Sequence, residues 1–195
     1  PSGLRAKFRR AGYALRVDLR TLSGAPVARL ALAAHPSSPA ALVPLAAEGG
    51  VHGFFCYDRS SPGFSTGLRA LLADRRESAF VVAGTEERDA RGLRADLDAA
   101  CSAFGTDVLD AFLVLYVAPD DDASAVDALL DELAAAKAAG RVRYAGISAH
   151  DRAIAAARVA DPRVDVLMHR YNMAHRGAES RVLPAALAAE TPVVA

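Results

Sequence analysis

The stretch GRVRYAGISAHDRAIAAARVADPRVDVLMHRYN, from Gly140 to Asn172, decides the fold of this chain. It holds two short apolar runs, Val142–Ser148 and Val164–His169, and between them the alanine-rich segment Arg152–Ala160. Continuous apolar runs of this length are typical of strands buried on both faces, which occur in parallel sheets. Because neighbouring parallel strands need a long connection, the alanine-rich segment predicts a crossover helix between them.

The same alternation of apolar runs and helical segments extends in both directions along the chain. The predicted strands are Val27–Ala34, Val51–Tyr57, Ala79–Ala83, Val108–Val117, Val142–Ser148, Val164–His169 and Pro192–Ala195. The predicted helices are Pro39–Ala47, Thr66–Asp74, Gly92–Phe104, Ala123–Ala139, Arg152–Ala160 and Glu179–Ala189. Strict alternation favours a parallel sheet covered by helices. The segment Tyr13–Leu19 predicts one arm of an N-terminal hairpin ahead of the first strand.

Seven strands and six crossover helices, with no break in composition, predict a single domain over residues 1–195. These units fit a (β/α)8 TIM barrel better than a doubly wound sheet, and a complete barrel needs about 250 residues. The sequence therefore predicts an α/β fold, a (β/α)8 barrel that is incomplete as given. We expect the polypeptide to continue beyond Ala195, or an oligomer partner or second chain to complete the barrel, because an open barrel leaves an unpaired edge.

Composition excludes several classes of function. The chain has 195 residues, 23 basic and 23 acidic side chains and a pI near 7.4, so no nucleic-acid partner is expected. No apolar run reaches the roughly 20 residues of a membrane-spanning helix, so no membrane association is expected. Cys56 and Cys101 are too few for a disulfide framework, and a cytoplasmic location is expected. Lys7 and Lys137 are the only lysines, which restricts any mechanism that needs one.

Three motifs stand in the same order as in one known enzyme family. Gly140–Asn172 contains Gly-x-Val-Arg-x-x-Gly-x-Ser, then a helical segment and a strand that leads to Tyr-Asn. FGTDVLDAFLVL spans Phe104–Leu115, and GVHGFF spans Gly50–Phe55. Together these motifs resemble the aldo-keto reductases, and the resemblance covers nearly the whole chain. It implies a TIM barrel that carries out NADPH-dependent reduction of a carbonyl substrate.

The resemblance also implies a catalytic tetrad of Asp, Tyr, Lys and His, in which the tyrosine protonates the carbonyl oxygen and the lysine lowers its pKa. All four positions differ in this chain. Cys56 stands at the Asp position, Ser61 at the Tyr position, Ala83–Thr85 where the Lys is expected and Leu115–Val117 where the His is expected. We therefore expect either an oxidoreductase with a relocated proton donor or a non-catalytic pseudoenzyme that binds a ligand or a partner protein.

The carboxyl end of the second predicted strand offers a candidate for the missing carboxylate, since chemistry gathers at these ends in βα barrels. Asp58 follows that strand by one residue. Because side chains alternate along a strand, Asp58 is expected to share a face with Cys56, while Tyr57 points away. Asp58 is therefore a candidate catalytic residue.

Tyr116, after the fourth predicted strand, is the candidate for the proton donor. Without a neighbouring cation its pKa stays near about 10, and a packed or hydrogen-bonded tyrosine is the competing interpretation. His169 at the end of the sixth strand, or His150 after the fifth, is expected to assist it.

NADPH is the cofactor that the resemblance implies. In the family a Ser-Asn pair after the fifth strand and a Gln on the sixth hold the nicotinamide carboxamide. Ser148 matches the serine and is a candidate for cofactor binding. Ala149 replaces the asparagine, and Met168 replaces the glutamine.

Arg170 is the second candidate for cofactor binding, because a guanidinium suits carboxylate and phosphate groups. With Arg176 it predicts a small-molecule ligand at the barrel mouth that carries an anionic group. The competing interpretation is a salt bridge from these arginines to Asp165 or Glu179. No metal site is expected, because the spacing of His175 and Glu179 matches no complete ligand pattern.

Overall fold

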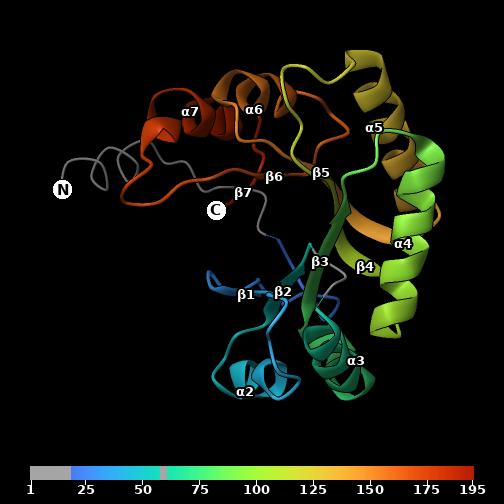
Figure 1. The fold of residues 1–195 in the computed structure, drawn as a ribbon. Helices are drawn as coiled ribbons and strands as arrows, with labels where there is room; N and C mark the ends of the chain where they lie inside the picture. The colour runs from blue at the N-terminus through green and yellow to red at the C-terminus, as the bar shows by residue number, and fades with distance from the viewer. Residues whose placement is uncertain (1–18, 58–60) are drawn as a thin grey trace.

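Seven parallel strands form the centre of the computed structural model, which describes residues 19–57 and 61–195 (Figure 1). The strands are β1 (Ala31–Ala33), β2 (Gly53–Cys56), β3 (Phe80–Thr85), β4 (Leu109–Val114), β5 (Val142–Ser148), β6 (Val166–Met168) and β7 (Val193–Val194). Each strand pairs in parallel with the next one along the chain. This sequential parallel order is that of a (β/α)8 barrel, so the predicted barrel architecture is confirmed through seven strands.

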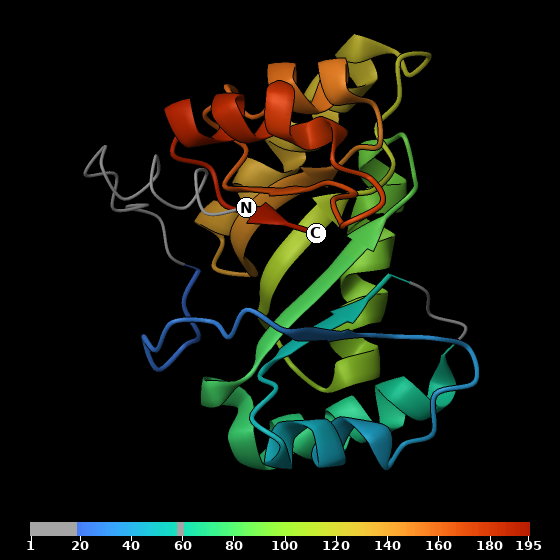
Figure 2. The ribbon, with the colours of Figure 1, turned by 90° about the vertical axis from the view of Figure 1, so that its left-hand side faces the viewer.

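Helices cover the convex face of the curved sheet (Figure 1, Figure 2). They are α2 (Leu42–Glu48), α3 (Pro62–Arg75), α4 (Ala90–Phe104), α5 (Ala123–Ala138), α6 (Arg152–Arg158) and α7 (Val182–Ala188), with 3-10 turns η1 (Arg76–Ser78) and η2 (Gly177–Ser180). All six predicted crossover helices are present. Helix α3 begins earlier than predicted, because Pro62 is favoured in a first helical turn. None of the helices in the described part of the chain is long and apolar enough to cross a membrane.

The first strand is shorter than predicted. It begins at Ala31 and not at Val27, because Val27 closes a tight antiparallel turn in which its N–H donates to the Leu19 carbonyl at 2.9 Å. Arg20 and Pro26 form an antiparallel bridge within this turn. The turn is the described part of the predicted hairpin, whose other residues, 13–18, lie outside the described residues.

The fourth strand also ends earlier than predicted, at Val114 rather than Val117. The cause is Tyr116, whose backbone has a φ of 55°, in the left-handed region that ends an extended strand. The prediction of a strand through Val117 was wrong at this point. The turn places Tyr116 at the carboxyl edge of the sheet, where the functional site is expected.

Two clusters of apolar side chains make up the core, one on each face of the sheet. The inner cluster contains Phe80, Val82, Ala111, Leu113, Leu115 and Val166. The outer cluster packs the sheet against the helices, and its largest fully buried members include Phe54, Phe64, Phe104, Phe112, Leu93, Leu97, Leu129 and Leu130. Each such side chain contributes about 1.5–3 kcal/mol when fully buried. Since side chains alternate along a strand, membership of a cluster tells which face each residue occupies.

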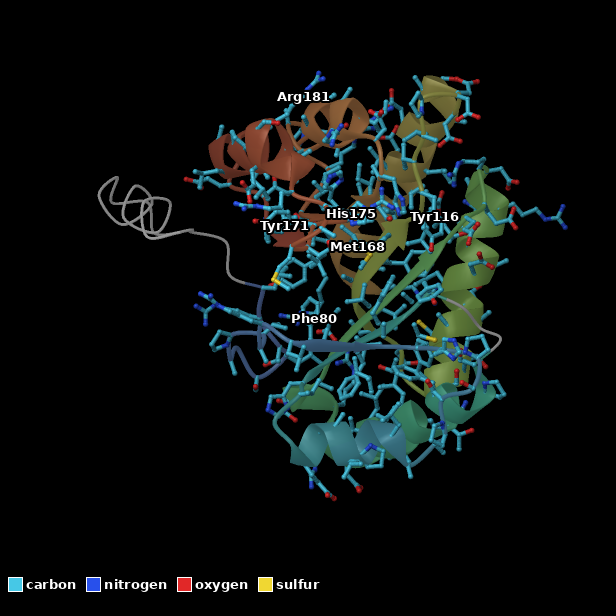
Figure 3. All side chains as sticks on the ribbon, turned by 60° about the vertical axis from the view of Figure 1, so that its left-hand side comes forward. Phe80, Tyr116, Met168, Tyr171, His175 and Arg181 are labelled. Atoms are coloured by element: carbon cyan, nitrogen blue, oxygen red, sulfur yellow. The ribbon has the colours of Figure 1, made fainter. Side chains whose placement is uncertain are left out.

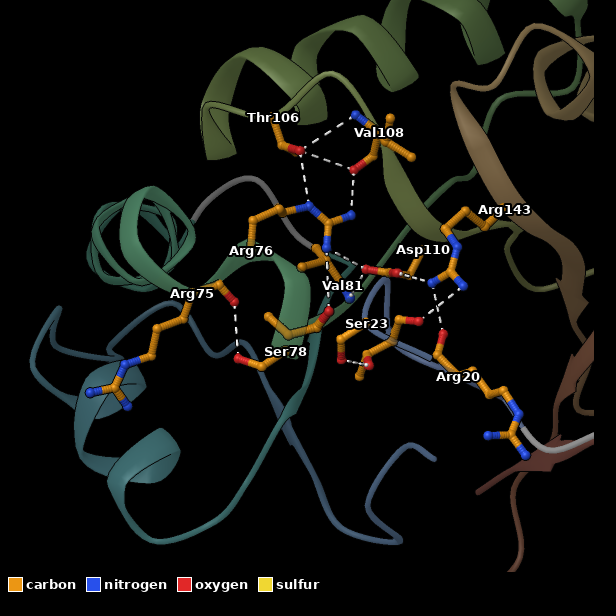
Figure 4. Close-up of polar contacts among 12 residues, drawn as sticks. Arg20, Ser23, Arg75, Arg76, Ser78, Val81, Thr106, Val108, Asp110 and Arg143 are labelled. Atoms are coloured by element: carbon orange, nitrogen blue, oxygen red, sulfur yellow. Dashed lines mark hydrogen bonds and ion pairs between the residues drawn. The ribbon is translucent and has the colours of Figure 1, made fainter. Parts of the chain in front are cut away.

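A buried ion-pair network closes the amino edge of the sheet (Figure 4). The Asp110 side chain is 0% exposed and accepts hydrogen bonds from Arg76 at 2.9 Å, Arg143 at 2.6 Å and the Val81 N–H at 2.8 Å. Arg143 also donates to the carbonyl of Arg20 at 2.7 Å. The network therefore attaches the N-terminal turn to strands β3, β4 and β5.

Three aspartates begin helices at the opposite, carboxyl edge. The side chain of Asp89 accepts from the N–H of Gly92 at the start of α4, and Asp122 and Asp151 cap α5 and α6 in the same way. These caps satisfy N–H groups that the helices themselves leave unpaired. Part of the acidic run before α5 is therefore explained by capping.

Candidate active site at the carboxyl edge of the sheet

Aromatic and charged side chains gather where successive strands end. Tyr57 follows β2, Glu86 follows β3, Tyr116 follows β4 and His150 comes two residues after β5. Neighbouring parallel strands end at one edge, so these four residues occupy adjacent positions around the barrel. We call this edge, together with the residues that follow β6, the mouth.

The two faces of β2 are the reverse of the expected arrangement. Phe54 and Cys56 belong to the outer cluster, whereas Phe55 packs against the inner one. The rings of Phe55 and Tyr57 lie 5.4 Å apart, as expected for neighbours on one face. Tyr57 is therefore on the inner side and Cys56 is not, which corrects the expectation that Tyr57 points away. Asp58 lies outside the described residues.

Tyr116 is held in a strained turn at the mouth (Figure 3). A left-handed backbone costs a bulky residue about 1–3 kcal/mol and persists only where surrounding contacts impose it. Arg88 supplies such contacts, because its guanidinium donates to the carbonyl oxygens of Leu115 at 3.0 Å and Tyr116 at 3.3 Å. Arg88 is itself held by Asp121 at 2.8 Å. The ring of His150 lies edge-on to that of Tyr116, with centroids 5.7 Å apart.

The surroundings of Tyr116 keep its phenol protonated. Partial burial raises the pKa of Tyr116, and the negative charge of Glu86 and the nearby phenol of Tyr57 raise it further. The side chain is nevertheless 41% exposed. Tyr116 can therefore donate a hydrogen bond to a ligand at neutral pH, but it is a weaker acid than an ordinary tyrosine.

The Leu113 carbonyl and the Leu115 side chain close the space beside Gly84, which lies where the resemblance implies a lysine. Gly84 lies on β3, and a Cβ atom added to it would lie 2.7 Å from Cγ of Leu115 and 2.6 Å from the Leu113 carbonyl oxygen. Ala83 faces the outer cluster. The Thr85 hydroxyl donates to Asp96 at 2.7 Å on α4. With Leu115 in place, none of these three positions offers room for a long side chain directed into the mouth.

Ser61 occupies the position at which the resemblance implies the catalytic tyrosine. It precedes helix α3, is completely buried, and its hydroxyl has no hydrogen-bond partner within the described part of the chain. A group with no exposed surface cannot touch a ligand at the mouth in this conformation. Tyr116 is therefore the better-placed hydroxyl.

The two candidates Ser148, at the end of β5, and His169, directly after β6, lie on opposite faces of the sheet. Ser148 is 3% exposed and pairs in register with Met168, which packs against the inner cluster, so the Ser148 hydroxyl is on the inner face. His169 follows Met168 and therefore faces the helices. Its ring is buried, and Nδ1 lies 2.7 Å from the Ala149 carbonyl oxygen. His169 holds two strand ends together in this arrangement.

The resemblance implies three side chains that contact the nicotinamide carboxamide, and only one of these three positions has a suitable side chain in this chain. Ser148 offers a hydroxyl on the inner face. Ala149 is completely buried in the outer cluster and has no polar side-chain atom. Met168 offers only a thioether, which is a weak acceptor. The carboxamide contacts implied by the resemblance are therefore not reproduced as a set.

The arginines after β6 have different surroundings. Arg176 pairs with Glu179 at 2.8 Å, and the Tyr171 hydroxyl donates to the same carboxylate at 2.8 Å. Asp165 pairs with Lys137 at 2.6 Å. Arg170 is exposed and has neither an ion pair nor a side-chain hydrogen bond to any residue in the described ranges. Both predicted anion-binding arginines are exposed, but only Arg170 is without an ion-pair partner among the described residues.

Possible metal ligands do not converge at the mouth. Glu179 is engaged by Arg176 and Tyr171, and Nδ1 of His175 lies 3.2 Å from the Asn172 side-chain oxygen. Among residues 19–57 and 61–195 no three His, Cys, Asp or Glu side chains are placed to hold a metal ion.

A separate groove of about 720 Å³ lies away from the mouth, toward the amino edge of β5 and the ends of α6 and α7. Its lining includes Tyr144, Val159, Asp165, Ala185 and Glu190. Asp165 is already paired with Lys137, and the Tyr144 hydroxyl accepts from the Arg20 N–H at 3.3 Å. Asp161 in the same lining pairs with Arg163 at 2.7 Å, so three of the titratable side chains of the groove serve structural contacts.

Sequence reasoning missed three residues of the mouth. Tyr57 was predicted on the wrong face of the strand. Phe54 and Phe55 occupy opposite faces and are both apolar, so the sequence does not show which face is the inner one. Glu86 and Arg88 were not predicted as site residues, although they follow the predicted strand Ala79–Ala83 by three and five residues. The position of acidic and basic residues within about five residues of a predicted strand end is the signal that could have found them.

The sequence matches the Aldo/keto reductase family over residues 69–195, more than half of the chain. The chain belongs to this family. A search among curated proteins found no match. The family accounts for the sequential barrel and for the motifs in β4, β5 and β6.

Solved structures of aldo-keto reductases share this fold. AKR11C1 from Bacillus halodurans, in its holo form, gives a TM-score of 0.76 at 15% identity, covering 90% of this chain and 64% of that one. An aldo-keto reductase from Klebsiella pneumoniae in complex with NADPH gives 0.75 at 18% identity, covering 90% and 66%. The glycerol dehydrogenase AKR11B4 from Gluconobacter oxydans gives 0.73 at 15% identity, covering 93% and 63%. The chain therefore spans less than two thirds of each of these structures.

Proposed function

We propose that this aldo/keto reductase family protein binds a small carbonyl compound at its mouth through the Tyr116 phenol and does not use the family's tyrosine–lysine proton transfer. The observation that supports this proposal is the close approach of the Leu113 carbonyl and the Leu115 side chain to Gly84, which leaves no room at Gly84 for the lysine that the resemblance implies. A tyrosine without a neighbouring cation keeps its proton and acts as a hydrogen-bond donor. A carbonyl oxygen is the acceptor that such a donor suits.

The rest of the mouth supports a ligand that carries more than a carbonyl group. Arg170 is exposed and has no partner in the described part of the chain, so it is available to a carboxylate or phosphate. The Tyr116 turn is preorganised by Arg88, which lowers the entropy lost on binding. The proposed ligand is thus a small carbonyl compound with an anionic group directed toward Arg170.

A second candidate function is NADPH-dependent carbonyl reduction with Tyr116 as the proton donor. It is favoured by the position of His150, whose ring lies edge-on to that of Tyr116 with centroids 5.7 Å apart, so that both rings border the same part of the mouth. The Klebsiella pneumoniae relative is described in complex with NADPH. Among the described residues only Ser148 offers a hydroxyl to the carboxamide of such a cofactor, which places this function second.

A single set of measurements separates these functions. Full-length protein is titrated with NADPH by nicotinamide fluorescence, and NADPH oxidation is followed with a panel of aldehydes and keto acids. Binding of the same carbonyl compounds is measured by calorimetry in the wild type, Tyr116→Phe and the control Tyr171→Phe. Binding that Tyr116→Phe weakens about tenfold, without turnover, is the expected result.

Other results have equally definite meanings. Turnover that Tyr116→Phe abolishes and Tyr171→Phe leaves intact would replace the first function by the second. Turnover that survives Tyr116→Phe would overturn both, because Tyr116 would then not be the donor. Loss of affinity for keto acids, but not for aldehydes, in Arg170→Ala would support the anionic contact.

A further inference from the structure

Two tyrosine rings and a carboxylate stand on neighbouring strand ends in one part of the mouth. Cys56 of β2 pairs with Ala83 of β3, so Tyr57 comes next to the end of β3. Thr85 pairs with Val114 of β4, so Glu86 comes next to the turn that carries Tyr116. Both tyrosine side chains are accessible, Tyr57 at 36% and Tyr116 at 41%. Exposed aromatic surface is available here for a ligand rather than consumed by the core.

This part of the mouth has a negative charge balance. The loop segments 86–89 and 115–122 hold six carboxylates and one guanidinium, Arg88. Asp89 and Asp122 cap helices, and Asp121 pairs with Arg88. Glu86 is exposed, and its charge contributes to the raised pKa of Tyr116. The local charge favours a positive group and disfavours a negative one.

The geometry of the turn adds an independent observation. Arg88 holds Tyr116 in a left-handed backbone conformation, which is unfavourable for a bulky side chain. Strained residues of this kind cluster at ligand-binding sites. This turn ends β4 and fixes the Tyr116 ring at the mouth.

We propose that Tyr57, Tyr116 and Glu86 bind an alkylammonium group of the ligand. The negative faces of aromatic rings attract cations, most strongly quaternary ammonium groups, and a carboxylate adds a counter-charge. This inference rests on the proposed function in one respect, since it names a second group of the same ligand, next to the carbonyl that the Tyr116 hydroxyl meets. The cationic site lies by β2 to β4, and Arg170 lies beyond β6, so the ligand class is a small zwitterion.

The test compares two compounds of the same shape. Choline and 3,3-dimethylbutan-1-ol differ in charge, because a quaternary nitrogen replaces a carbon atom. Calorimetric titration of the full-length protein at low ionic strength should show choline binding about tenfold more tightly. Added salt should reduce that difference, since part of it comes from Glu86.

Variants assign the effect to the three residues. Tyr57→Leu and Tyr116→Leu should each remove most of the preference for choline, and Glu86→Gln should remove part of it. Tyr116→Phe keeps the aromatic face and should keep choline binding while it weakens the carbonyl compounds. Glu190→Gln and Tyr171→Leu, away from this cationic site, are matched controls and should leave the preference for choline unchanged. Thermal unfolding of each variant confirms that it is folded.

Equal affinity for choline and its neutral analogue would overturn the inference, and so would a preference that survives Tyr57→Leu and Glu86→Gln. The proposed function has its own readout in the uncharged aldehydes. If those bind through Tyr116 and choline does not, the proposed function stands and the cationic site falls. If choline binds and no carbonyl compound does, the cationic site stands and the proposed function falls.

Discussion

At the amino edge of the sheet, the carboxylate of Asp110 is completely buried and accepts hydrogen bonds from Arg76, Arg143 and a backbone N–H. At the carboxyl edge of the same sheet, Tyr116 exposes 41% of its surface and has a strained backbone. The carboxylate at the amino edge is satisfied within the chain, whereas the phenol at the carboxyl edge is exposed. The contrast shows how a βα barrel separates the residues that stabilise it from those that act.

The largest effect is expected at the amino edge. Asp110→Ala removes the buried partner of two guanidinium groups and should lower the free energy of unfolding by about 3–5 kcal/mol. Urea denaturation measures this change. Asp98→Ala is the matched control, because Asp98 is 64% exposed beside Arg141 and should change stability by less than about 1 kcal/mol. Similar effects of both substitutions would contradict the contrast between buried and exposed pairs.

An intermediate effect is expected where Leu115 packs against Gly84. Gly84→Ala introduces a Cβ atom 2.7 Å from the Leu115 side chain and should destabilise the protein by about 1–3 kcal/mol. In the Leu115→Ala background the same substitution should cost less, because the contacts with the Leu115 side chain are then gone and only the Leu113 carbonyl oxygen, at 2.6 Å, still opposes the new Cβ atom. A double-mutant cycle measures this coupling. Strictly additive effects would show that Leu115 does not fill the space beside Gly84.

The smallest effect concerns the ionisation of Tyr116. Ultraviolet titration should find this phenol among the last to ionise, because burial and Glu86 raise its pKa above the ordinary value of about 10. Glu86→Gln should lower the pKa of Tyr116. Since the folded phenol ionises later than the unfolded one, stability should fall as the pH rises above about 10, and Tyr116→Phe should remove that part of the fall. An unchanged titration curve in Tyr116→Phe would contradict the assignment.

The barrel could be predicted from the sequence because every strand lies between helical segments. Apolar runs such as Val142–Ser148 have the length and composition of strands buried on both faces, and the structure reproduces that strand residue for residue. Strand ends were less predictable. Val27 is apolar and β-branched, yet it closes a turn, because the hydrogen bond from its N–H to Leu19 depends on chain folding that composition does not record.

The mouth could be predicted only in part. Strand order brings Tyr116 and Ser148 to the carboxyl edge, so their placement followed from the fold alone. The face on which Tyr57 lies could not be predicted from the fold. Phe54 and Phe55 are both apolar, and a strand buried on both sides has no polar face that shows its orientation. The contacts of Arg88 also escaped prediction, since a long side chain reaches residues nearly thirty positions away in sequence.

Arg88 also links the turn that carries Tyr116 to the start of α5. Its partner Asp121 accepts from Arg88 through one carboxylate oxygen and from the Ala118 N–H, at 2.9 Å, through the other. Opening of this ion pair would free the Tyr116 carbonyl and the Ala118 amide in one event. The rate at which the Ala118 amide exchanges with deuterium should therefore report the rate at which Tyr116 leaves its left-handed conformation. The residence time of a ligand that holds the Tyr116 ring would then appear as slowed exchange at an amide it never touches.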